Sequence, residues 1–250
     1  MALSRDEALR ELDALATVEH ALLVEYLRVS CVLGDGDGTA PPNPRVAAAS
    51  GDAFDLAVSA MKQLHRINTA LTLAGWPPQV GRAAAIRTEA GVELAFGPLS
   101  RADLDRLVAR EEDLARAVDA RTERLRPTVE GPDAVFADEL LFAVSGVVDV
   151  GTGHAGALDR LKGHLHDVPP AVYLRVTRQE PADDAERAVL DLADRYYHLV
   201  VANVRAAFAY DDAFGGSLLQ RALSTMDVMN AVDGLLTARG LLPAFTAPPG

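Results

Sequence analysis

The chain has little of several residue types that would define its chemistry at once. It contains one cysteine, Cys31, among 250 residues, which excludes an internal disulfide and a zinc site built from cysteines. Lysine and arginine together number 24 against 36 acidic residues, so the formal net charge is −12. Because no basic excess is present to neutralise backbone phosphates, we expect no nucleic-acid partner.

Long apolar runs are also missing from the sequence. No stretch is apolar for long enough to span a bilayer, and the N-terminal residues lack the hydrophobic core of a signal peptide. We therefore expect a cytoplasmic protein without a membrane partner. Only two of the basic residues are lysines, and this preference for arginine is typical of bacterial genomes rich in G and C.

Helical patterns dominate what is present. Ser4 and Glu7 form a capping box, and apolar residues then recur at helical spacing as far as Leu33. The predicted helices cover about residues 4–33, 50–75, 103–126, 132–165, 183–210 and 216–240. A short hairpin near Gly91 is expected in the long connection over residues 76–99. The fold class is therefore all-α, a helical bundle of a single domain over residues 1–250.

The first helix carries a carboxylate on an apolar face. Glu19 and Tyr26 are seven residues apart and share that face with Leu22 and Leu23. A carboxylate there is costly unless it is paired or bound to a metal, so Glu19 is a candidate site residue. The alternative is that Glu19 lies at the edge of the face, in solvent. Glu25 is rotated away and is expected to be solvated.

Three further groups are candidates on the later helices. His65 lies three residues after Lys62, and is either a ligand or a hydrogen-bonded core residue. Lys62 is either a buried functional lysine or a surface one. Asp149 and His154 interrupt an apolar, glycine-rich helix, where Asp149 either needs a buried partner or caps a broken turn. No Glu-x-x-His occurs in the chain, so the usual di-iron formula of helical bundles is not met.

Four segments together resemble the ferritin-like proteins of bacterial specialised metabolism, including the ferritin-like domain of iminophenyl-pyruvate dimer synthase. These segments are Val18–Leu27, Met61–His65 with its following Gly-Trp-Pro-Pro, Val148–His154, and the C-terminal helices that contain Tyr-Tyr-His. The resemblance implies a ferritin-like four-helix bundle with additional helices. It also implies that Glu19 and His65 are iron ligands, that Asp149 replaces a ligand Glu, and that His154 matches a further His. Lys62 stands where the family has another Glu.

The resemblance predicts an enzyme that modifies a small organic metabolite, with two chemistries open. In one, Glu19, His65, Asp149 and His154 hold a single iron ion. In the other no cofactor is present, and Lys62 forms an acid–base pair with Glu19, assisted by Tyr26 or His65. The alternative function is a non-catalytic small-molecule-binding or scaffold protein that has lost its metal site and acts through a homodimer face or a bound metabolite.

Overall fold

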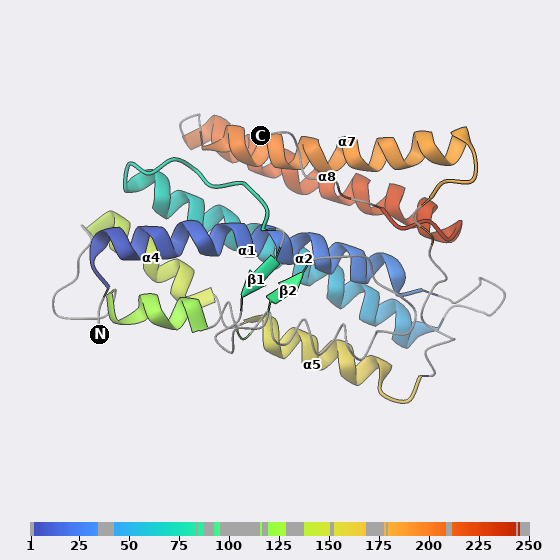
Figure 1. Ribbon diagram of the computed structural model, residues 1–250, viewed down its shortest axis with the longest axis horizontal. Helices are drawn as coiled ribbons and strands as arrows, with labels where there is room; N and C mark the ends of the chain where they lie inside the picture. The colour runs from blue at the N-terminus through green and yellow to red at the C-terminus, as the bar shows by residue number, and fades with distance from the viewer. Residues whose placement is uncertain are drawn as a thin grey trace.

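The computed structural model describes residues 3–34, 43–83, 85–87, 93–95, 116, 120–128, 138–150, 153–168, 178, 180–208, 212–243 and 245. Helices make up most of this part of the chain (Figure 1). They are α1 (Arg5–Val32), α2 (Pro44–Leu73), α4 (Asp138–Val150), α5 (Gly153–Leu165), α7 (Asp184–Ala207) and α8 (Asp212–Ala238), with a further helical stretch over 120–128. No helix among the described residues is long and apolar enough to cross a membrane.

The first helix begins where its capping box predicts. The Ser4 side chain accepts a hydrogen bond from the backbone N–H of Glu7, and the Glu7 carboxylate accepts one from the backbone N–H of Ser4. This reciprocal pair satisfies N–H groups that have no partner inside the helix. Two acidic residues in the first turn, Asp6 and Glu7, also suit the positive end of the helix dipole.

The second helix begins earlier than predicted. The Asn43 side chain caps it, and Pro44 lies in the first turn, where its missing N–H removes no intrahelical bond. The predicted start near Ser50 was therefore wrong, because this Asn-Pro pair begins a helix rather than continuing a loop. The predicted end is confirmed: Gly75 follows the helix with φ +76°, a left-handed conformation that costs glycine little.

Two other expectations needed adjustment. The single helix predicted over 132–165 is divided into α4 and α5, and its glycine-rich middle lies at the division. Helix α8 begins at Asp212, a turn earlier than predicted. The hairpin is confirmed as two three-residue antiparallel strands, β1 (Ala85–Arg87) and β2 (Glu93–Ala95), in which Ile86 pairs with Leu94.

Helix α2 has neighbours on two sides, with α1 along one side and α4 and α5 along another. Helices α7 and α8 pair with each other and lie beyond α1 in Figure 1. One cluster of buried apolar side chains connects α1, α2, α4, α5, α7 and α8. Each fully buried leucine or valine contributes roughly 1.5–3 kcal/mol, so this shared core holds the helices together. The all-α fold class is thus confirmed.

Candidate functional site

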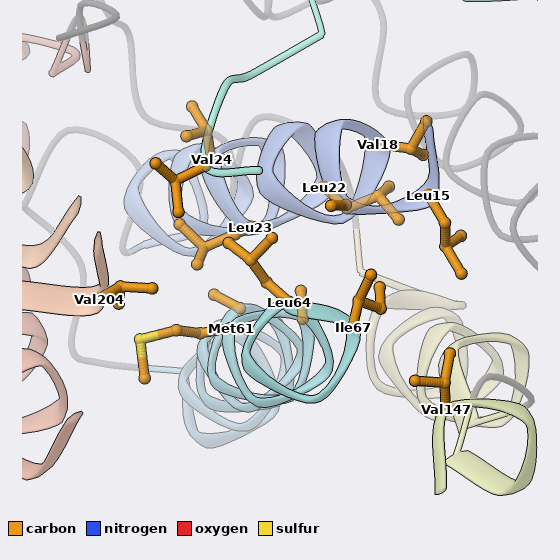
Figure 2. Packing of buried hydrophobic residues seen from close by; sticks show 14 of the residues in the cluster. Leu15, Val18, Leu22, Leu23, Val24, Met61, Leu64, Ile67, Val147 and Val204 are labelled. Atoms are coloured by element: carbon orange, nitrogen blue, oxygen red, sulfur yellow. The ribbon is translucent and has the colours of Figure 1, made fainter. Parts of the chain in front are cut away.

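A small apolar cavity lies where α1, α2 and α7 meet. Figure 2 shows Leu23 of α1, Met61 and Leu64 of α2 and Val204 of α7 around this region. The lining side chains are His20, Leu23, Met61, Leu64, Val80, Tyr197, Val200, Val201 and Val204. Its free volume is about 10 Å³, which is room for roughly one water molecule. Only two of the lining residues, His20 and Tyr197, have polar side chains.

The imidazole of His20 is held by two hydrogen bonds that define its tautomer. Nδ1 lies 3.0 Å from the carbonyl oxygen of Val80, and Nε2 lies 2.7 Å from the hydroxyl of Tyr197. Because a carbonyl oxygen only accepts, Nδ1 carries the proton and Nε2 of the neutral ring accepts. The Tyr197 hydroxyl therefore donates to His20.

The chain segment after α2 positions the carbonyl that orients His20. Asn68 exchanges hydrogen bonds with the backbone of Gln79, and the backbone N–H of Ala83 donates to the carbonyl of Thr17 over 3.1 Å. These contacts hold the segment against α2 at Gln79 and against α1 at Ala83, and Val80 lies between the two. The segment thus fixes the imidazole from the side opposite to Tyr197.

The ring of Tyr197 also contacts Arg82 and Phe245, which lies near the C-terminus. The guanidinium carbon of Arg82 lies 5.9 Å from the centre of the tyrosine ring, and its Nη1 donates to the carbonyl of Phe245 over 2.6 Å. The Phe245 ring meets Tyr197 edge-on, with 5.8 Å between ring centres. A cation over an aromatic face and an edge-on ring pair are both favourable contacts. Tyr197 is accordingly fixed from several directions.

Burial keeps both members of the pair neutral. Loss of solvent lowers the pKa of His20 to about 4, outweighing the hydrogen bond to Val80. Burial raises the pKa of Tyr197 to about 12, although the positive charge of Arg82 acts in the opposite direction. Near pH 7 the proton therefore stays on Tyr197, and His20 acts as a hydrogen-bond acceptor.

The predicted residues of α1 are buried, whereas Lys62 is not. Glu19 and Tyr26 are at most 1% exposed, so the alternative that placed Glu19 in solvent was wrong. Lys62 is exposed on α2. Glu19 and Lys62 therefore do not form a buried acid–base pair in the structure. The charged amino group of Lys62 stays in solvent, because burying it would cost its hydration free energy. Glu25 is also buried, against expectation, and forms a 2.9 Å ion pair with Arg28.

His65 faces away from the helix that carries Asp149. Its ring packs on Phe208 at the end of α7, with ring centres 5.1 Å apart. Gln63 donates instead to the carbonyl of Val147 in α4 over 2.7 Å. Because positions two apart on a helix lie about 200° apart, His65 and Gln63 face opposite neighbours. The α2 side chain directed toward α4 is thus a neutral amide and not the predicted histidine.

The described residues do not fit a metal centre. Within that part of the chain, no three His, Cys, Asp or Glu side chains lie close enough to hold one ion. Asp149 and His154 belong to the helical backbone of α4 and α5, but their side chains lie outside the described structure. Of the four predicted ligands, only the side chains of Glu19 and His65 are described, so a common iron site of Glu19, His65, Asp149 and His154 stays a prediction.

A further buried carboxyl group, that of Asp233, lies on α8 near Asp194 of α7. Asp233 is fully buried, and among the described residues neither of its carboxylate oxygens has a hydrogen-bond partner. Desolvation raises its pKa well above the ordinary value, and the nearby charge of Asp194 adds to this effect. The sequence analysis did not single out Asp233, because it lies in a helix with apolar residues on several sides.

The sequence also did not indicate Tyr197 or Arg82 as site residues. Tyr197 follows the core spacing of α7, which predicts burial only. Its partner His20 is 177 residues away, and no local pattern reports such a contact. Arg82 lies in the long connection after α2, where arginine has no periodic signal to interpret.

Comparisons with known proteins identify the fold. No protein-family model matches the chain, and neither does any curated protein sequence. Among solved structures, a ferritin-like protein from Caulobacter vibrioides is similar, with a TM-score of 0.58 and 10% sequence identity. The match covers 98% of this chain and 99% of that chain. The fold is therefore ferritin-like, as the sequence resemblance implied.

Proposed function

We propose that this chain is a ferritin-like protein that binds a small, largely apolar organic metabolite between α1, α2 and α7, where the side chains that line the small cavity separate to admit it. The observation that carries the proposal is the Tyr197–His20 pair at the wall of an otherwise apolar cavity. Ligand sites combine an apolar lining with a small number of placed polar groups. The Tyr197 hydroxyl donates to His20 and its oxygen also interacts with the guanidinium of Arg82, so one remaining lone pair is left for a ligand hydroxyl or N–H.

Two features favour binding over the chemistries expected from the sequence. Lys62 is exposed whereas Glu19 is buried, and His65 packs on Phe208 instead of facing α4. This supports the alternative of a small-molecule-binding protein whose ancestral metal site is degenerate. The resemblance to the ferritin-like domain of iminophenyl-pyruvate dimer synthase suggests the setting, which is cytoplasmic specialised metabolism in a bacterium.

Acid–base catalysis at the same pair is the second candidate. Arg82 lies over the Tyr197 ring, where its positive charge favours a phenolate. Tyr197 would then transfer its proton to or from the substrate, with His20 orienting the hydroxyl. The pKa values of about 12 and about 4 lie far from neutrality on opposite sides, so the proton is held firmly on Tyr197 at rest. Binding without turnover is therefore the first candidate.

The test of binding uses small aromatic and aliphatic alcohols, amines and acids as probes, detected by ligand-observed NMR. We expect at least one hydroxyl or amine probe to bind the wild type. Val201→Phe, which fills the cavity, abolishes binding, and Tyr197→Phe weakens it. Tyr196→Phe, a change of the neighbouring half-buried tyrosine, leaves it unchanged. Absence of any bound probe, or binding unaffected by Val201→Phe, contradicts the proposal.

Two further measurements separate the competing functions. Turnover of a bound probe that depends on the Tyr197 hydroxyl favours catalysis over binding alone. The metal content of protein purified without chelators tests the single-iron chemistry. One iron per chain would contradict a degenerate metal site and would favour the hypothesis of an iron-dependent enzyme.

A further inference from the structure

The large exposed apolar side chains are concentrated on one surface. Among the described residues, five large hydrophobic side chains are exposed, and four of them lie on α7 and α8. These four are Leu192 and Leu199 of α7 and Val228 and Leu235 of α8, which we call the α7–α8 strip. The most exposed member, Leu235, is 65% accessible. Figure 1 shows α7 and α8 side by side along one edge of the molecule.

The spacing within the strip is that of helix–helix contacts. Leu192 and Leu199 are seven residues apart, as are Val228 and Leu235, so each pair projects from one side of its helix. Ala193 packs in one cluster with Val232 and Leu236, which sets the two helices in register. In that register Leu192 is level with Leu235, and Leu199 is level with Val228.

Helix α8 is apolar on both of its sides. Its inner side buries Ala222, Met226 and Met229 in the main core, while Val228 and Leu235 lie outside. Exposed polar residues such as Ser224 and Asp227 also lie on α8, so the apolar residues of its outer side form a narrow stripe. The structure supplies a neighbour on the inner side, so the outer side is suited to a contact with another helical surface.

Charges on the strip are complementary to those of a second copy. Arg195 is exposed between the two leucines of α7, and Asp227 is exposed beside Val228 on α8. The whole chain carries a net charge of −12, which opposes self-association, so opposite charges that meet across the interface offset part of this repulsion. Rotating a copy by 180° about an axis along the helices places α7 over the partner's α8. Arg195 is then level with the partner's position 232, about 7.5 Å along the helix from the partner's Asp227, which a long arginine side chain can reach.

We propose that the α7–α8 strip is a homodimer interface in which a second copy of this chain packs through a two-fold axis. Leu192 meets the partner's Leu235, and Leu199 meets the partner's Val228. Such an isologous contact uses the same surface twice and closes after two copies. The four helices then form an intermolecular bundle whose centre is apolar and whose rim carries the Arg195–Asp227 pairs.

The test measures the molar mass by light scattering and the dissociation constant by sedimentation over a range of protein concentrations. We expect a dimer for the wild type. Leu199→Asp, which places a charge at the centre of the interface, weakens it at least about tenfold. The matched control is Leu73→Asp, which should leave the dimer intact. Leu73, 51% accessible at the end of α2, is the fifth large exposed hydrophobic among the described residues and lies off the strip. A monomeric wild type overturns the proposal, as does equal weakening by both variants.

A second test reverses the charges of the proposed Arg195–Asp227 pair, so that a loss of dimer can be told apart from a folding defect. Both Arg195→Asp and Asp227→Arg change exposed residues, so circular dichroism should show a native helical fold. Each single reversal weakens the dimer, because like charges then meet across the axis. The double variant restores the wild-type dissociation constant to within about threefold. Failure of the double variant to recover, with both single variants impaired, overturns the two-fold arrangement.

Discussion

Tyr197 and His20 are 177 residues apart in the sequence and share a buried hydrogen bond of 2.7 Å. The bond connects α7 to α1, so this pair of side chains joins the two paired C-terminal helices, α7 and α8, to the first helix. The Val80 carbonyl on the other side of the ring fixes which nitrogen accepts. The strength of this connection can be measured because each partner has an isosteric or near-isosteric replacement.

Removing the Tyr197 hydroxyl should destabilise the protein. Tyr197→Phe keeps the ring but leaves Nε2 of His20 buried without a donor, which costs about 1–3 kcal/mol of the free energy of unfolding. Urea unfolding followed by circular dichroism measures the change. Tyr196→Phe, a change of the half-buried neighbour, should alter that free energy by less than about 0.5 kcal/mol. An equal effect of the two variants would show that the hydroxyl of Tyr197 has no special role.

The stability should fall in acid because of His20. The folded state holds this histidine neutral down to a pKa of about 4, whereas in the unfolded chain it binds a proton near pH 6.5. As the pH falls from 6.5 to 4, the unfolded state gains a proton that the folded state does not, so unfolding becomes easier by about 3 kcal/mol. Below about pH 4 this contribution stops changing.

The variant His20→Gln should lose this part of the pH dependence, which a series of urea titrations at different pH values detects. His166→Gln, a change of a histidine exposed near the end of α5, should retain it. Direct observation of the imidazole by NMR gives an independent check. A His20 that protonates near pH 6.5 in the folded protein would contradict the buried neutral pair.

Asp233 should have the opposite effect on stability. Its pKa in the folded protein is raised well above 3.8 by desolvation and by Asp194. From pH 4 upward the unfolded chain releases this proton first, so the stability falls as the pH rises until the folded group also ionises. Asp233→Asn removes the charge and should stabilise the protein at pH 8 by roughly 1 kcal/mol or more, but much less at pH 4.

The measurement for Asp233 is thermal and urea unfolding at both pH values. Asp191→Asn is the matched control, because Asp191 is exposed on α7, and it should change little at either pH. If Asp233→Asn gains no stability at pH 8, the carboxyl group has a compensating partner in the folded protein.

Much of the fold follows from local sequence. The capping box at Ser4 and the left-handed Gly75 mark one helix start and one helix end, and each acts through backbone groups within one turn. The start of α2 was missed because the Asn43–Pro44 pair is equally compatible with a loop and with an N-cap. The burial of Tyr197 follows the apolar periodicity of α7, because burial depends on one helix face.

The candidate site could not be predicted in the same way. Glu19 and Lys62 looked equivalent as charged residues near an apolar stripe, yet one is buried and the other exposed. A shift of one or two positions around a helix decides which neighbour a side chain meets, and this depends on how the helices cross. The contact between His20 and Tyr197 depends on that packing as well, so neither residue carries a local signal.

Adjacent positions on α2 therefore provide a sharp comparison. Lys62→Glu restores the acid that the family resemblance places there, but at an exposed position. We expect the iron content after purification without chelators to stay at the wild-type value and the free energy of unfolding to change by less than about 0.5 kcal/mol. Gln63→Glu should instead destabilise the protein by about 1–3 kcal/mol, because a buried carboxylate replaces the N–H that bonds Val147. A gain of iron by Lys62→Glu would show that position 62 does reach a metal site.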